Sequence, residues 1–284
     1  MIYARTDLVS ISFGSVRWFQ RYFHPVNEYG YRDLPYSDER LEGKRLLAVL
    51  GDSMAAGHGT RDYHDRFSGV LQEEIGDAWV VATLAMIGWG PDLEYDNLMH
   101  FPRKPDALVL SVYYNDIEDV TTALDKNFQP VQLQRPNLLT AWFVMHSYTF
   151  NFVYWSIVMP TFLHDGAYEA YLAEVLNDEV VWSGFEAKLQ PFLDYAAERN
   201  IPVAAVVFPM LHRPDITCPF DDNVLAFFRE KGVPALSVAE CVADLPPEAR
   251  ILNNMDAHPS DLVHERVGHA LADLLRESGI TTKD

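Results

Sequence analysis

The chain has 284 residues, of which 49% are hydrophobic and 22% are charged, a composition typical of a globular protein with a sizeable core. This composition excludes an intrinsically disordered chain, a collagen-like chain and a low-complexity array. The formal net charge is −19 at pH 7, and such an excess of carboxylates repels nucleic-acid phosphates and anionic membrane surfaces. We therefore expect neither nucleic acid nor a membrane as a partner.

Two features bear on the redox and cellular environment. Cys218 and Cys241 are the only cysteines, and we expect two unpaired, buried thiols rather than one bridge. The first residues lack the basic region, apolar run and small-residue cleavage site of a signal peptide. We expect a cytoplasmic protein, or a secreted or periplasmic one if a leader precedes the given sequence.

Apolar runs of strand length alternate with helical patterns along the chain. The expected strands occupy residues 45–50, 79–84, 107–112, 203–208 and 235–238. Because these runs are continuously apolar, they predict a sheet that is buried on both faces. The expected helices occupy residues 67–75, 92–101, 185–199, 223–231 and 261–277. This alternation predicts a doubly wound α/β domain.

Two segments do not fit the alternation, and we expect them to be additions to a single domain spanning 1–284. Residues 1–44 precede the first strand as an N-terminal extension, and residues 117–180 form a helical and aromatic insert. Within the insert, 136–164 has no formal charge and is rich in aromatic residues. A membrane span is disfavoured there by interspersed polar residues and by Pro160. We expect instead a pair of buried helices, a lid over the active site, or the interface of a homo-oligomer.

The first chemical motif is Gly51-Asp52-Ser53, directly after the first strand. A serine at a strand-to-helix turn lies at the carboxyl end of the sheet, where ligands bind in such folds. Asp52 could cap the helix that follows, and that helix start would offer backbone N–H groups. Alone, this tripeptide is more typical of a helix cap than of a nucleophile.

Three further motifs lie at comparable places: Gly88-Trp89-Gly90-Pro91 after the second strand, Tyr114-Asn115-Asp116 after the third, and Asp256-Ala257-His258-Pro259 before the last helix. Each alone is typical of a turn, a cap or a loop. In a sheet of order 2-1-3-4-5, however, the loops after the first three strands are neighbours. They would bring Ser53, Gly88 and Asn115 together.

These residue types are suited to acyl transfer. A serine needs a base near pH 7, and His258 with Asp256 would supply the base and its orienting carboxylate. The N–H groups of Ser53 and Gly88 and the amide of Asn115 would supply three donors for an oxyanion hole.

The four motifs, in this order and at this spacing, resemble those of the SGNH hydrolase (GDSL lipase/esterase-like) superfamily over about residues 27–279. The resemblance implies a flavodoxin-like three-layer α/β/α sandwich with a five-stranded parallel sheet of order 2-1-3-4-5. It implies a serine esterase that cleaves O-acetyl or short-chain esters of a small molecule or carbohydrate through an acyl-enzyme on Ser53, without metal or cofactor. The same residues would also suit an acyltransferase, and the same fold would suit a binding module without catalysis.

The sequence departs from the family pattern at several positions. Tyr113 replaces the usual glycine before Asn115, Thr83 replaces a common asparagine, and one residue rather than two separates the acid from the base. We expect Tyr113 and Trp89, with Trp142 and Trp155 of the insert, to contact the substrate. His264 and His269 would point about 140° apart on a helix, so we expect no metal site there.

Overall fold

The computed structural model describes residues 22–128, 138–147, 149–150, 153–154, 157, 167–253 and 256–282. Its centre is a parallel sheet of five strands in the order β2-β1-β3-β4-β5, which confirms the order that the family resemblance implies. The strands are β1 (Arg45–Gly51), β2 (Trp79–Ala85), β3 (Ala107–Tyr113), β4 (Val203–Phe208) and β5 (Ala235–Ser237). Every residue of β2, β3 and β4 is buried, which explains why their sequences are continuously apolar.

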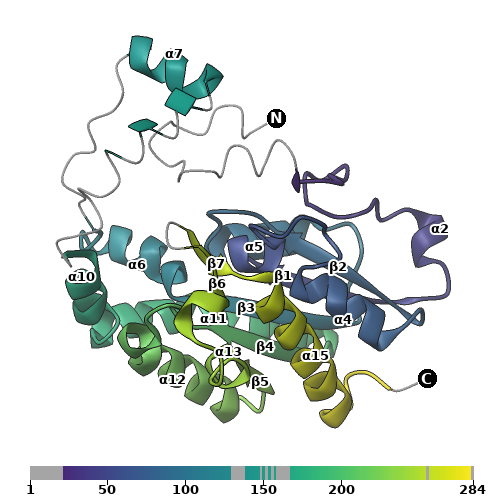
Figure 1. Cartoon of the computed structure of the whole chain (residues 1–284). Coiled ribbons are helices and arrows are strands. Elements are labelled where there is room, and N and C mark those ends of the chain that lie inside the picture. Colours follow the sequence, from purple (N-terminus) through teal and green to yellow (C-terminus); the bar gives the residue numbers. More distant parts are fainter. Residues whose placement is uncertain are drawn as a thin grey trace.

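Helices cover both faces of the sheet and make the fold a three-layer α/β/α sandwich (Figure 1). α4 (Phe67–Ile75) and α15 (Asp261–Glu277) pack against each other on one face. Parallel strands are joined by right-handed crossovers. The helices that follow β2, β3 and β4 therefore cover the other face. These are α5 (Pro91–His100), α11 (Glu179–Arg199) and α12 (Pro214–Glu230).

Several elements begin earlier than expected or were not expected. α11 begins at Glu179 because Asp178 caps it, accepting the N–H groups of Val180 and Val181. α12 begins at Pro214, where the missing N–H costs no helical hydrogen bond. A small antiparallel hairpin, β6 (Ile251–Asn253) with β7 (Asp256–Pro259), replaces the loop that we expected before α15. The short helices are α2 (Asp38–Leu41), α3 (Ser53–Ala56), α6 (Glu118–Ala123), α13 (Val238–Cys241) and α14 (Pro247–Arg250).

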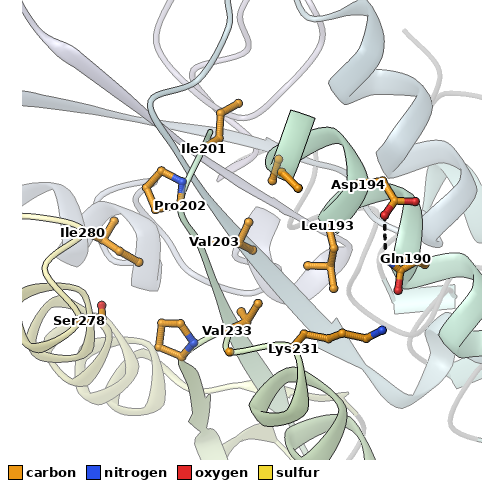
Figure 2. Close-up of a pocket in the computed structure, with 14 residues that line it drawn as sticks. Gln190, Leu193, Asp194, Ile201, Pro202, Val203, Lys231, Val233, Ser278 and Ile280 are labelled. Carbon is orange, nitrogen blue, oxygen red and sulfur yellow. Dashed lines mark hydrogen bonds between the residues drawn. The ribbon is translucent and has the colours of Figure 1, made fainter. Parts of the chain in front are cut away.

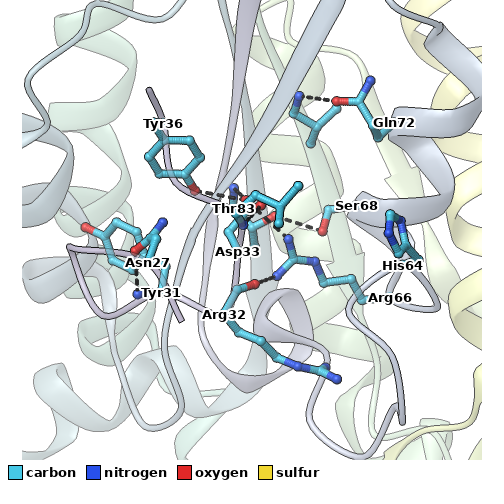
Figure 3. Close-up of polar contacts among 12 residues, drawn as sticks. Asn27, Tyr31, Arg32, Asp33, Tyr36, His64, Arg66, Ser68, Gln72 and Thr83 are labelled. Carbon is cyan, nitrogen blue, oxygen red and sulfur yellow. Dashed lines mark hydrogen bonds and ion pairs between the residues drawn. The ribbon is translucent and has the colours of Figure 1, made fainter. Parts of the chain in front are cut away.

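The described part of the N-terminal extension is packed onto the edge of the sheet. Asp33 accepts the backbone N–H of Thr83 in the edge strand β2 at 3.0 Å and pairs with Arg66 at 3.2 Å (Figure 3). Gln72 of α4 accepts the N–H of Val81 in the same strand at 2.8 Å. These side chains satisfy backbone groups that an edge strand otherwise presents to solvent or to another chain.

The insert includes parts that pack on the domain and parts that do not. After β3, the 3₁₀ helix η2 (Tyr114–Ile117) leads into α6, and at the end of the insert α10 (Ala167–Val175) packs against α12. Between them, α7 (Leu138–His146) stands away from the three layers (Figure 1).

The expected pair of buried helices is wrong for most described residues of this segment: Leu139, Trp142 and Ile157 are 70%, 54% and 67% exposed, whereas Val144 is buried. Within the described residues, no helix is both long enough and apolar enough to cross a membrane. Both cysteines are free, as expected, but Cys218 is exposed and Cys241 is only partly buried. The expectation of buried thiols is therefore wrong.

Candidate active site

The motif after β1 forms a tight turn at the carboxyl end of the sheet. A Cβ atom on Gly51 would lie 2.8 Å from the Cβ of Ser111 and 2.9 Å from that of Ala55, so only glycine fits between β3 and the following helix. Asp52 caps α3 by accepting the N–H of Met54 at 2.9 Å. Ser53 is the first residue of α3 and is 5% exposed.

The Asp256-Ala257-His258-Pro259 motif reaches Ser53 from β7 of the hairpin. Nε2 of His258 lies 2.9 Å from Oγ of Ser53, and Nδ1 of His258 lies 2.5 Å from Oδ1 of Asp256. Because the carboxylate accepts the Nδ1–H, the lone pair of Nε2 faces the serine hydroxyl. The side chain of His258 is 25% exposed, so this hydrogen-bonded chain is accessible from solvent.

The environment of Asp256 keeps its carboxylate charged. Burial opposes ionisation, but hydrogen bonds from His258 and His58 and the positive charge that these rings can carry hold the pKa of Asp256 well below its usual range. A carboxylate that stays ionised at neutral pH can orient an imidazole and stabilise its protonated form.

The two other expected motifs follow β2 and β3, the strands on either side of β1. Asn115 lies in η2, and its amide donates to Oδ2 of Asp52 at 3.0 Å. Gly88 lies exposed in the turn after β2 with a φ of 75°. That turn is tied to β1 by the N–H of Met86, which donates to the carbonyl of Gly51 at 3.4 Å. Within the described residues, neither Ser53 nor Gly88 uses its backbone N–H in a hydrogen bond.

The structure thus links Ser53, His258 and Asp256 by direct hydrogen bonds. It links Asn115 to Ser53 through Asp52. Gly88 lies at the adjacent strand end without a described contact to Ser53.

The expected substrate-contacting aromatic residues are less closely placed. Trp89 packs edge-on against Tyr31, 5.9 Å between centroids, so its ring holds the N-terminal segment. Tyr113 is buried at the end of β3, with its ring centroid 4.2 Å from that of Tyr114. Trp142 stacks on His146 in α7 at 4.6 Å and has no described contact with Ser53, Asp256 or His258. Trp155 lies outside the described residues.

His58 is part of the site and was missed. It is buried, and its Nε2 lies 3.1 Å from Oδ2 of Asp256, while its ring centroid lies 4.0 Å from that of His258. Burial and the nearby His258 lower the pKa of His58, against the opposing effect of Asp256, which favours a neutral ring. The only signal in the sequence is its position five residues after Ser53.

His58, Asp256 and His258 are also the one group of described residues whose ligand atoms, within 4.8 Å of one another, are close enough to hold a metal ion. Their mutual hydrogen bonds account for this arrangement without an ion. His264 and His269 are separate, as expected: His264 is buried and accepts the N–H of Phe67 at 3.3 Å, whereas His269 pairs with Glu74.

A pocket of about 420 Å³ lies elsewhere in the fold (Figure 2). Its lining includes Ile201 and Pro202, directly before β4, and Val233 and Pro234, directly before β5. These residues mark the amino edge of the sheet, opposite the edge that carries Ser53. The pocket is therefore not part of the candidate active site.

Comparison with known proteins finds solved structures of similar fold. No family model and no curated protein matches the chain. A lipolytic protein of the G-D-S-L family from Desulfitobacterium hafniense has a TM-score of 0.51 at 11% identity, covering 82% of this chain and 100% of that one. The esterase EstA from Pseudoalteromonas, solved inhibited by monoethylphosphonate, has a TM-score of 0.50 at 11% identity, with coverages of 84% and 100%. The lipase Lip_vut3 from a goat rumen metagenome has a TM-score of 0.50 at 13% identity, with coverages of 81% and 97%. The chain has the fold of these G-D-S-L (SGNH) hydrolases.

Proposed function

We propose that the protein is a serine esterase of the SGNH type. The observation that carries this proposal is the chain of hydrogen bonds from Ser53 Oγ to His258 Nε2 at 2.9 Å and from His258 Nδ1 to Asp256 Oδ1 at 2.5 Å. A serine, a base and an orienting carboxylate at these distances form the arrangement that activates a hydroxyl for attack on a carbonyl carbon. The fold shared with lipolytic proteins and esterases supports the same activity.

In the first half of the reaction, His258 Nε2 takes the proton of Ser53 as Oγ attacks the ester carbonyl. The tetrahedral intermediate collapses, the bond to the alcohol oxygen breaks, and that oxygen takes the proton from His258. This leaves an acyl group on Ser53. In the second half, His258 takes a proton from water, the hydroxide attacks the acyl carbon, and Ser53 leaves with the proton restored.

The negative charge of both intermediates would meet three donors. Two are the backbone N–H groups of Ser53 and Gly88, which the described residues leave unused. The third is the amide of Asn115, whose second N–H remains after the first has bonded to Asp52. Donors fixed in advance of the reaction stabilise developing charge most effectively.

The proposed substrate is a short-chain ester, such as an O-acetyl ester of a small molecule or carbohydrate. Tyr113 and Tyr114 are both buried directly before Asn115. Two phenol rings at the end of β3 leave less room for an acyl chain than the glycine that the family pattern has in place of Tyr113. This crowding favours acetyl over longer acyl groups.

Ester hydrolysis with matched serine variants tests the proposal. We expect Ser53→Ala to lower the turnover of p-nitrophenyl acetate by on the order of 10⁴- to 10⁶-fold while the fold persists, because little packing is lost at this turn. Ser278→Ala, at an exposed serine far along the chain, is the control and should keep wild-type activity. A fluorophosphonate should label the wild type and the control but not Ser53→Ala. Residual activity within tenfold of wild type in Ser53→Ala contradicts the proposal.

Acyl transfer to an alcohol instead of water is the second reaction that these residues could perform. Product analysis with and without an acceptor alcohol separates the two, because a transferase releases free acid slowly and forms the new ester when the acceptor is present.

A further inference from the structure

The residue that the acyl-transfer chemistry leaves unexplained is His58. Nε2 of this residue lies 3.1 Å from Oδ2 of Asp256, the oxygen that does not face His258. The side chain of His58 is 4% exposed. A buried histidine on the second oxygen of the orienting carboxylate is not required for a serine, a base and an acid to work together, so it calls for a separate account.

We propose that His58 is a positioning residue of the active site, which holds Asp256 in the orientation that places its Oδ1 against Nδ1 of His258. This inference rests on the proposed function. A carboxylate bound on one oxygen alone can rotate about its terminal bond, because that torsion has a broad, shallow profile. Hydrogen bonds to both oxygens from two different elements fix the plane of the carboxylate, and with it the direction of the His258 ring.

The proton on His58 follows from the same contact. An ionised carboxylate only accepts hydrogen bonds, so Nε2 of His58 must carry the proton that it donates to Asp256. The ring is best kept neutral, since a cationic His58 would lie 4.0 Å, centroid to centroid, from His258, which itself becomes cationic in each half of the reaction. Burial of His58 favours that neutral form.

The loop that carries His58 is held rigidly from two sides. On one side, the buried guanidinium of Arg32 donates to the carbonyls of Gly57 at 2.9 Å and Thr60 at 3.0 Å. Figure 3 shows Arg32 next to the Asp33 and Arg66 pair that anchors the N-terminal segment. On the other side, a Cβ on Gly59 would lie 2.0 Å from a methyl carbon of Leu252 in β6. The loop is therefore packed against the hairpin that supplies Asp256. This packing keeps His58 and Asp256 at hydrogen-bonding distance.

Three variants at position 58 distinguish the effect of a hydrogen-bond donor from the effect of side-chain size. Gln and Met have almost the same shape, but only Gln offers an N–H at about the place of Nε2. Asn offers the same amide one methylene group short of Asp256. We expect His58→Met and His58→Asn to lower kcat for p-nitrophenyl acetate by about 10- to 100-fold, the range typical of residues that orient a metal ligand through a hydrogen bond. KM should change less than twofold, and His58→Gln should stay within about threefold of wild type.

The rate of fluorophosphonate labelling of Ser53 gives a readout of nucleophile activation that does not depend on ester turnover. It should fall in the Met and Asn variants by the same factor as kcat and be restored in the Gln variant. Thermal unfolding identifies a variant that does not fold. If the Met variant is lost in this way, the comparison of Gln with Asn, both polar, still decides the question.

The outcomes distinguish this inference from the function on which it rests. If the wild type is active and labelled at Ser53, but the three variants all match it, or the Gln variant falls as far as the Met variant, then His58 does not position Asp256. If the wild type shows no Ser53-dependent activity or labelling, the proposed function fails first and the inference fails with it.

Discussion

The amide of Asn115 donates to Oδ2 of Asp52 at 3.0 Å, and this joins the motif after β3 to the motif after β1. Oγ of Ser53 also lies 3.3 Å from this carboxylate oxygen. Asp52 is completely buried between them, and burial raises its pKa against the opposing effect of these hydrogen bonds. Asp52 therefore acts as a fixed anchor that orients the Asn115 side chain beside Ser53.

From this arrangement we predict that Asn115→Ala lowers kcat by roughly 10²- to 10³-fold, equivalent to about 2.7–4 kcal/mol, with little change in KM. The reason is that the free N–H of the amide would bind charge that is present mainly in the transition state. Steady-state kinetics with p-nitrophenyl acetate measure both constants. Asn177→Ala, at an exposed asparagine, serves as the control. An increase in KM at constant kcat would instead make Asn115 a residue that binds the ground-state substrate.

Replacement of Asp256 should be less damaging than replacement of His258. Asp256→Asn keeps one oxygen, but places an amide N–H against a ring N–H of His258 or His58, which disturbs the tautomer of the base. We expect kcat to fall by about 10⁴-fold for Asp256→Asn and by about 10⁶-fold for His258→Ala. Single-turnover hydrolysis is sensitive enough to measure both. A larger loss in His264→Ala or His269→Ala would identify a different base.

The pH dependence of stability should depend measurably on His264. Burial, reinforced by the charges of Arg32, His258 and Arg66, lowers the pKa of His264 to about 3. In the unfolded chain this group binds a proton near pH 6.5, so between pH 6.5 and pH 3 only the unfolded form is protonated. Its contribution to stability is present in full above pH 6.5 and is lost as the pH falls toward 3, at about 1.4 kcal/mol per pH unit.

For His264→Asn, which keeps an acceptor for the N–H of Phe67, we expect the loss of unfolding free energy between pH 7 and pH 5 to be smaller than in wild type by about 2 kcal/mol. Urea unfolding at the two pH values measures this difference. His64→Asn, at an exposed histidine, is the control. An equal pH dependence in wild type and His264→Asn would show that the buried ring takes up a proton without unfolding.

The sheet and the places of its chemical residues could be predicted from the sequence because both are local signals. Five apolar runs specify the buried strands, and the motifs with Ser53, Gly88 and Asn115 directly follow three of them. Once the strand order is assumed, these motifs are neighbours without any knowledge of side-chain packing. The hairpin strand that carries Asp256 and His258 was expected as a loop, because four residues with a polar start give no strand signal.

The support of the site depends on contacts between distant parts of the chain, and no local pattern indicates them. His58 and Asp256 are separated by 198 positions, and the anchor from Asp33 to Thr83 by 50. A histidine after a glycine, or an Arg-Asp pair in a polar stretch, is compatible with many surface turns. Only the packed structure shows that Arg32 is fully buried and that the N-terminal extension holds the loop that follows α3.

The last prediction concerns acyl-chain length and Tyr113. If this ring limits the acyl site, then Tyr113→Leu, which removes the ring while leaving a smaller cavity than alanine would, should improve the use of butyryl relative to acetyl esters. Two more buried methylene groups are worth about 1.6 kcal/mol, so the ratio of kcat/KM for butyrate to that for acetate should rise on the order of 15-fold. Tyr113→Phe keeps the volume and should keep the wild-type ratio. Trp142→Ala should keep it too, because Trp142 lies exposed on a helix that stands away from the layers. A shift in Trp142→Ala with none in Tyr113→Leu would show that α7 closes over the site as a lid and that the ring at the end of β3 does not set substrate size.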